Sequence, residues 1–289
     1  MNAPGAVVSF WSWQLGAALA LNFAIAAVQV AAYASRLAGV RTGRVGTSIS
    51  LFNLFVTASR FANMFYAPML GSIADAAGRI VTRQPELVPL EVSEFAWQMR
   101  AIVVAGTLGT LAGALLLPTF SHLFVRGVGA FERRGSIPRA LARLGDPRVI
   151  GDALRTLRLP PLDFHVRFSL AHVPPKLLIG NLVVTAIYAI GVVASYLASV
   201  LHPDVARTAL SASGLVNGIA TVSFALIVDP TSAFMVDQAV KGERTLEEIK
   251  SMVFYLALSA VIGTIASQLL LYPAAVFIAG AARLVNGHP

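Results

Sequence analysis

The sequence contains no cysteine and few charged residues. Among 289 residues only 12% are Asp, Glu, Lys or Arg, whereas a typical soluble domain has about 25%. The absence of cysteine excludes disulfides and thiolate metal sites. A GxxxxGK[ST] motif is also absent, which excludes nucleotide binding through a P-loop, and neither HExxH nor an acidic metal cluster occurs within an apolar run. We therefore expect no cofactor, no metal and no nucleotide.

Hydrophobic residues make up 56% of the chain, and the mean hydropathy is +0.73. A soluble protein this apolar would expose large greasy patches to water, so the excess must face lipid. A membrane-spanning helix needs about 20 apolar residues. The sequence therefore predicts an all-α membrane protein with six transmembrane helices, in the runs 10–35, 48–74, 100–125, 176–200, 208–236 and 250–281.

The basic residues are distributed unevenly along the chain. A net charge of +8 would suit nucleic acid in a soluble protein, but here it points to loops on the cytoplasmic side, and no nucleic-acid partner is expected. Most Lys and Arg lie after the first, third and fifth runs. The positive-inside rule therefore places those loops in the cytoplasm and both termini outside.

Two halves of the chain resemble each other. Gly109-Thr110-Leu111-Ala112 precedes a leucine run that ends in proline, and Gly263-Thr264-Ile265-Ala266 does the same. Each half holds three predicted spans, an odd number, so the halves would enter the membrane from opposite sides. Such inverted repeats are typical of alternating-access transporters, whose substrate site lies near mid-membrane between the repeats.

The repeat divides the chain into three parts. Residues 1–126 form the first three-helix repeat and residues 176–289 the second. Residues 127–175 join them as a basic amphipathic cytoplasmic segment. Within this segment Asp146 and Pro147 are typical of a helix start, and apolar residues then recur at helical spacing opposite arginines, as in a helix that lies on headgroups.

Charges inside spans are costly and mark candidate functional sites. Arg60 lies deep in the second run on one stripe with Asn53 and Asn63. Asp229 precedes Pro230 in the fifth run and is the best anionic partner for Arg60 within the chain. The two could form a structural pair that sets helix register, or the planar guanidinium could receive a phosphate of the substrate.

Two further sets complete the candidate substrate-binding residues. Arg36, Arg41 and Arg44 lead into the second run, where they either serve only the positive-inside signal or form an electrostatic funnel for anionic headgroups. Asn217 in the fifth run corresponds to Asn53 in the repeat. It could line the same cavity, or join helices by hydrogen bonds.

Several short runs of the sequence carry a family resemblance: 36–44 (RLAGVRTGR), 50–53 (SLFN), 59–64 (SRFANM), 228–230 (VDP) and the segment from Gly263 to Pro273. These runs resemble the Amj family, bacterial lipid II flippases that act as alternates to MurJ. The resemblance implies an integral membrane transporter that moves undecaprenyl-pyrophosphate-linked peptidoglycan precursor, lipid II, from the inner to the outer leaflet of the cytoplasmic membrane. It implies no catalytic residue.

The expected function is thus a membrane transporter rather than an enzyme, with lipid II and membrane lipids as partners. A small-solute or ion-coupled secondary transporter remains an alternative, because inverted repeats and a buried arginine serve it equally well. An intramembrane enzyme acting on isoprenoid phosphates is another, although the paired glutamates and PGxSRS loop of such phosphatases are absent. The energy source and homodimerisation stay open.

Overall fold

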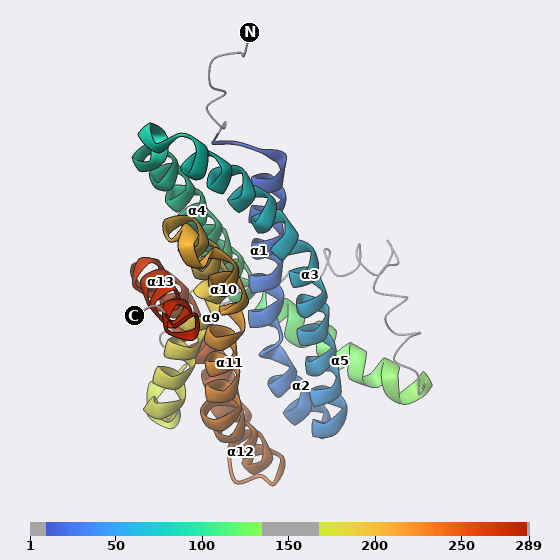
Figure 1. Cartoon of the computed structure of the whole chain (residues 1–289). Helices are drawn as coiled ribbons and strands as arrows, with labels where there is room; N and C mark the ends of the chain where they lie inside the picture. Colours follow the sequence, from blue (N-terminus) through green and yellow to red (C-terminus); the bar gives the residue numbers. More distant parts are fainter. Residues whose placement is uncertain (1–9, 135–167, 288–289) are drawn as a thin grey trace.

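The computed structural model describes residues 10–134 and 168–287, which are helical and contain no strand. The helices run side by side in one bundle (Figure 1). In the first half they are α1 (Trp13–Ala31), α2 (Ala34–Thr42), α3 (Val45–Arg83), α4 (Val88–Leu115) and α5 (Leu117–Arg134). In the second half they are α9 (Pro175–Leu201), α10 (Ala206–Ser211), α11 (Ser213–Ser223), a π-helical turn (Phe224–Val228), α12 (Asp229–Val240) and α13 (Leu246–Val285).

Local chemistry explains where several helices begin and end. The Ser12 side chain accepts a hydrogen bond from the backbone N–H of Leu15 and caps α1. Thr245 and Glu248 form a reciprocal capping box at the start of α13. Gly43 ends α2 in the left-handed region at φ 66°, a conformation that glycine adopts without steric cost. These caps satisfy backbone groups that a helix end leaves unpaired.

Five helical segments of the described residues are long and apolar enough to cross a membrane. They contain or overlap five of the six predicted spans. The remaining predicted span, the second (48–74), lies inside α3, a helix of 39 residues, and its crossing of the membrane stays a prediction. The five segments are Trp13–Thr42, Pro85–Leu115, Pro175–Leu201, Pro203–Val240 and Leu246–Val285.

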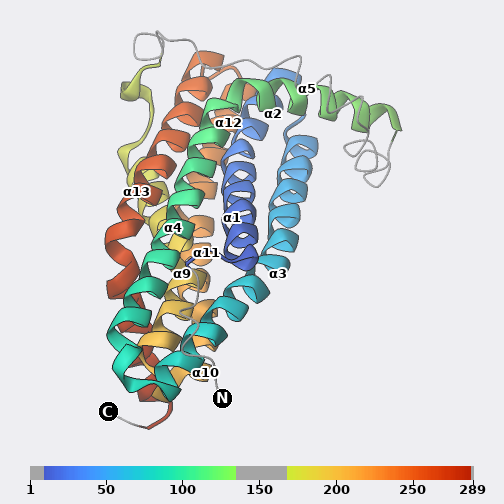
Figure 2. The ribbon, with the colours of Figure 1, turned by 90° about the horizontal axis from the view of Figure 1, so that it is seen from above.

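The bounds predicted for the third span, 100–125, are wrong. α4 covers Val88–Leu115, and the chain turns at Leu116 into α5, which runs across the end of the bundle and away from it (Figure 2). Hydropathy could not detect this turn, because leucines continue through it. Pro118 supplies the break, since it has no N–H to continue the ladder of α4 and is tolerated in the first turn of a new helix.

α5 is amphipathic and packs on α2 and α3. Its buried side is formed by Ser121, Phe124 and Val128, whereas Arg126 is exposed. The predicted helix that begins at Asp146 lies outside the described residues.

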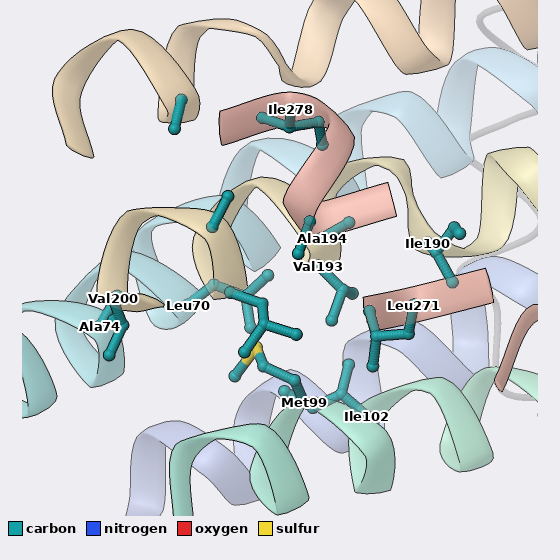
Figure 3. Close-up of a cluster of buried hydrophobic side chains, with 14 of the residues drawn as sticks. Leu70, Ala74, Met99, Ile102, Ile190, Val193, Ala194, Val200, Leu271 and Ile278 are labelled. Atoms are coloured by element: carbon teal, nitrogen blue, oxygen red, sulfur yellow. The ribbon is translucent and has the colours of Figure 1, made fainter. Parts of the chain in front are cut away.

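The core consists of two clusters, one toward each end of the bundle. Figure 3 shows the cluster in which Leu70 of α3, Met99 of α4 and Val193 of α9 converge with Leu271 of α13. Lipid tails are as apolar as these side chains, so close packing rather than water exclusion stabilises helix contacts in a membrane.

Each half contains an equivalent hydrogen bond between two of its long helices, α1 and α4 in the first half and α9 and α13 in the second. In the first half, Nδ2 of Asn22 on α1 donates to the carbonyl of Ile102 on α4, at 2.7 Å. In the second, Nδ2 of Asn181 on α9 donates to the carbonyl of Leu256 on α13, at 2.9 Å. Ile102 precedes Gly109 by as many residues as Leu256 precedes Gly263.

The two glycines also have equivalent surroundings. A Cβ on Gly109 would overlap the carbonyl of Phe23, the residue after Asn22, and a Cβ on Gly263 would overlap the carbonyl of Leu182, the residue after Asn181. Gly109 therefore permits close approach of α4 to α1, and Gly263 permits close approach of α13 to α9.

The two halves run in opposite directions. α1 and α4 end where α2 and α5 lie, whereas α9 and α13 begin at that same end, next to α12 (Figure 2). We call this the α2/α12 end; α10 lies at the other end.

Candidate functional site: a buried guanidinium between the two halves

An ion pair joins the two halves near the α2/α12 end, and its arginine is the least exposed side chain among the ion pairs of the described residues. Nη2 of Arg36 on α2 lies 2.9 Å from Oδ1 of Asp229, the first residue of α12. Nε of Arg36 donates to Oγ of Ser232, at 3.0 Å. The side chain of Arg36 is only 10% exposed, whereas that of Asp229 is 46% exposed. The guanidinium thus lies inside the protein while its carboxylate partner borders its surroundings.

Two aromatic rings complete the setting of Arg36. Its guanidinium carbon lies 5.4 Å from the ring centre of Tyr33 and 5.3 Å from that of Phe52 on α3, within the range of cation–π attraction. The third nitrogen, Nη1, is buried and has no hydrogen-bond partner in the described residues. A guanidinium carries five N–H donors, so this site retains donor capacity that the described residues do not use.

A polar chain continues from this site into the second half. Oη of Tyr33 donates to Oδ1 of Asn181 on α9, at 2.8 Å. Nδ2 of Asn181 lies 2.9 Å from both the carbonyl of Leu256 and Oγ of Ser259 on α13. Asn181 is completely buried, and these bonds satisfy its amide, as burial requires. This series of hydrogen bonds fixes the position of Tyr33 and hence one face of the Arg36 site.

Local backbone irregularities bring the partners together. Between α1 and α2 the ladder tightens, because the N–H of Tyr33, Ser35 and Arg36 bond to carbonyls only three residues earlier. Asp229 follows the π-helical turn Phe224–Val228 and precedes Pro230. π-turns change the direction of the side chains that follow and frequently occur at functional sites.

The three arginines expected to serve the positive-inside signal or to form an electrostatic funnel lie in different settings. Arg36 lies between the two halves, where it pairs with Asp229, and the funnel stays a prediction. Nη1 of Arg41 donates to Oγ of Ser121 on α5, at 3.2 Å. Arg44 is exposed at the start of α3. Hydropathy could not separate these residues, because the bend between α1 and α2 decides which arginine turns inward.

The sequence suggested Asp229 as the partner of Arg60, and the structure shows a partner that this prediction did not name. Asp229 pairs with Arg36. Arg60 lies on α3, but its side chain is outside the described residues, so its substrate role stays a prediction. Helical register could relate Arg60 to its own stripe but could not show which of several arginines reaches α12.

The three predicted asparagines do not join the pair through any hydrogen bond of the described side chains. Asn53 is exposed on α3, and Asn63 is half-buried on the same helix. Asn217 packs against Gly191 of α9, and its Oδ1 is buried without a hydrogen-bond partner in the described part of the chain. Their place in a substrate path therefore rests on sequence position alone.

Sequence reasoning missed two contacts between the halves. Nη1 of Arg100 on α4 donates to the carbonyl of Gln268 on α13, at 3.1 Å, and Nε2 of Gln268 donates to the carbonyl of Arg100, at 3.2 Å. Oη of Tyr196 on α9 donates to the carbonyl of Ala67 on α3, at 2.9 Å. Arg100 could have been found from its position well inside a long helical segment beside Trp97.

A second feature is a cavity of about 470 Å³ near the starts of α9 and α13. Its arginine, Arg244, already bonds to Gln238, Glu248 and the carbonyl of His172. These bonds use Nε and Nη1, and the ion pair with Glu248 already balances the charge of Arg244. Within the described ranges, no group of three His, Asp or Glu side chains could hold a metal ion.

The helices and this site define a multi-pass α-helical membrane protein with a buried cation between its two halves. The family model described as "Amj: Alternate to MurJ" matches residues 21–282, and the chain belongs to this family. It is similar to the lipid II flippase Amj of Bacillus subtilis (strain 168), with 34% identity over 256 residues that cover 88% of this chain and 91% of the relative. No solved structure matches the chain significantly.

Proposed function

We propose that this protein is a lipid II flippase, which moves undecaprenyl-pyrophosphate-linked peptidoglycan precursor from the inner to the outer leaflet of the bacterial cytoplasmic membrane. Family membership over residues 21–282 supports this function, as does the similarity to the lipid II flippase Amj of B. subtilis. The single observation that carries it is the guanidinium of Arg36, which is nine-tenths buried between the halves of an apolar helical bundle.

Physical chemistry relates this cation to the substrate. Moving a pyrophosphate unshielded through hydrocarbon would cost many kcal/mol, because an isolated ion loses its hydration there. A cation fixed within the membrane protein lowers that cost, and a guanidinium suits phosphate oxygens geometrically. The protein thus acts as a transporter that lowers a barrier and is not proposed to break covalent bonds.

We further propose that the halves are inverted repeats and that the chain crosses the membrane six times. The paired contacts of Asn22 with Ile102 and of Asn181 with Leu256 support this, together with the opposite directions of the halves. In this arrangement residues 1–126 and 176–289 are the repeats and residues 127–175 the connector. Rocking of one half against the other would change which leaflet the site faces.

The orientation follows from charge. We place the α2/α12 end in the cytoplasm, because most described Lys and Arg residues lie there. Both termini are then extracytoplasmic. Arg41 and Arg44 would attract the anionic headgroup from the inner leaflet, and Arg60 would meet the pyrophosphate deeper in the membrane. Asn53, Asn63 and Asn217 would meet the sugar and peptide.

The test is an assay of lipid II exposed in the outer leaflet of cells depleted of their other lipid II flippases. Expression of this protein should restore exposure and growth. Expression of Arg36→Gln at the same level should not. Failure of the wild-type protein to restore exposure, despite normal membrane insertion, would refute the flippase assignment and favour transport of a small solute.

A further inference from the structure

Arg36 has an unused donor in a place where unused donors are costly. Its Nη1 is buried and lacks a partner in the described residues, although Nη2 and Nε are both bonded. Leaving a buried polar group unpaired costs about 1–3 kcal/mol, and more for a charged group. Such a cost is expected where a ligand supplies the missing acceptor.

Asp229 uses only part of the hydrogen-bonding capacity of Arg36. Its carboxylate contacts one nitrogen of Arg36, whereas a phosphate can accept from two nitrogens at once. The carboxylate carries one negative charge, and a pyrophosphate carries at least two. Nearly half of the Asp229 side chain is exposed, so an anion could approach the guanidinium from the side on which the carboxylate now lies.

The opposite end of the bundle has an uncharged counterpart. There Tyr196, on the first helix of the second half, bonds to the carbonyl of Ala67, on α3 of the first half. Ala67 immediately precedes Pro68, as Asp229 immediately precedes Pro230. Each half thus sends one side chain of its first long helical segment to the residue before a proline of the other half. One of these two contacts is ionic and the other is neutral.

We propose that Arg36 is a phosphate-binding residue and that Asp229 is its exchangeable internal ligand, which a phosphoryl group of an anionic polyprenyl pyrophosphate displaces. This inference rests on the proposed function and places the headgroup contact where α2 of the first half meets α12 of the second. The uncharged Tyr196 contact offers no cation, so of these two contacts the one at the α2/α12 end receives the anion. Displacement of Asp229 breaks a link between the halves and thereby couples substrate arrival to their relative movement.

The experiment measures equilibrium binding of farnesyl pyrophosphate to the purified full-length protein in detergent, with farnesol as the uncharged probe and inorganic pyrophosphate as competitor. Arg36→Gln should weaken binding of farnesyl pyrophosphate by roughly ten-fold or more, because a charge-assisted hydrogen bond is lost. Arg36→Lys, which keeps the charge but not the fork, should weaken it less.

Asp229→Asn is the decisive variant. It removes the competing charge while keeping the size of the side chain, so binding should tighten several-fold. Tyr196→Phe is the matched control, because it removes the counterpart contact without altering charge, and it should leave binding unchanged. Inorganic pyrophosphate should compete in the wild type but less effectively than the lipid, which also gains contacts from its chain.

Three outcomes would overturn the inference: weakening by Asp229→Asn as large as that by Arg36→Gln, unaltered binding in Arg36→Gln, or binding of inorganic pyrophosphate without farnesyl pyrophosphate. The first would make the pair purely structural. The flippase assignment fails separately, if wild-type protein binds farnesyl pyrophosphate in detergent but does not restore lipid II exposure in cells.

Discussion

Replacement of Gly263 by alanine tests the packing between α9 and α13. An added Cβ would lie 2.5 Å from the carbonyl oxygen of Leu182 and 3.3 Å from the backbone nitrogen of Ala186. The first distance is well below van der Waals contact, and both atoms belong to backbone that cannot rotate away. The helices must therefore separate, which also loosens the side chains packed beside them.

The magnitude follows from two opposing effects. Overpacking of this kind costs about 1–3 kcal/mol, and exchange of glycine for alanine within a helix returns about 1 kcal/mol. Gly214 on α11 is the matched control, because an added Cβ there meets no atom within 4 Å, so only the favourable effect remains. The two variants should thus differ in free energy of unfolding by about 1–3 kcal/mol.

The assay is the temperature at which half of the purified protein loses its monodisperse size-exclusion peak in detergent. For a chain of this size 1 kcal/mol corresponds to about 2–4 °C, so Gly263→Ala should melt several degrees below Gly214→Ala. Gly109→Ala should behave as Gly263→Ala does, because a Cβ there would overlap the carbonyl oxygen of Phe23. Equal melting of Gly263→Ala and Gly214→Ala would refute the close packing of α9 on α13.

Three other predictions concern the buried polar contacts, the topology, and the predicted role of Arg60 on α3. Asn181→Ala should lower the melting temperature more than Asn22→Ala, because Asn181 makes three hydrogen bonds and Asn22 one; the reverse order in the same assay would contradict the buried polar chain. The absence of native cysteine permits single-cysteine labelling in intact cells: Leu284→Cys should react with a membrane-impermeant maleimide and Lys241→Cys should not, and the opposite pattern would reverse the orientation. Arg60→Ala should abolish restoration of lipid II exposure at normal protein level, and full restoration by this variant would remove Arg60 from the transport path.

The candidate site was only partly predictable. Arg36 and Asp229 both stood out from the sequence, since each is a charge in or beside an apolar run. Their pairing did not, because it depends on the tight turn before α2 and the π-turn before α12. Neither irregularity has a hydropathy signature. The same limit explains the third span, where an unbroken leucine run hides the turn at Leu116.

The sequence by itself determined the class of the protein. Its composition is poor in charged residues and rich in apolar runs, which requires lipid contact, and its short motifs resemble those of the family. The paired motifs around Gly109 and Gly263 indicated a repeat before any contact was visible. Only the tertiary structure decided which polar groups meet across the halves, because a contact between distant helices depends on bends, tilt and rotation that no periodicity in the sequence encodes. The tertiary structure alone therefore placed Arg36 between the halves, with a carboxylate on one nitrogen and another nitrogen that has no partner among the described residues.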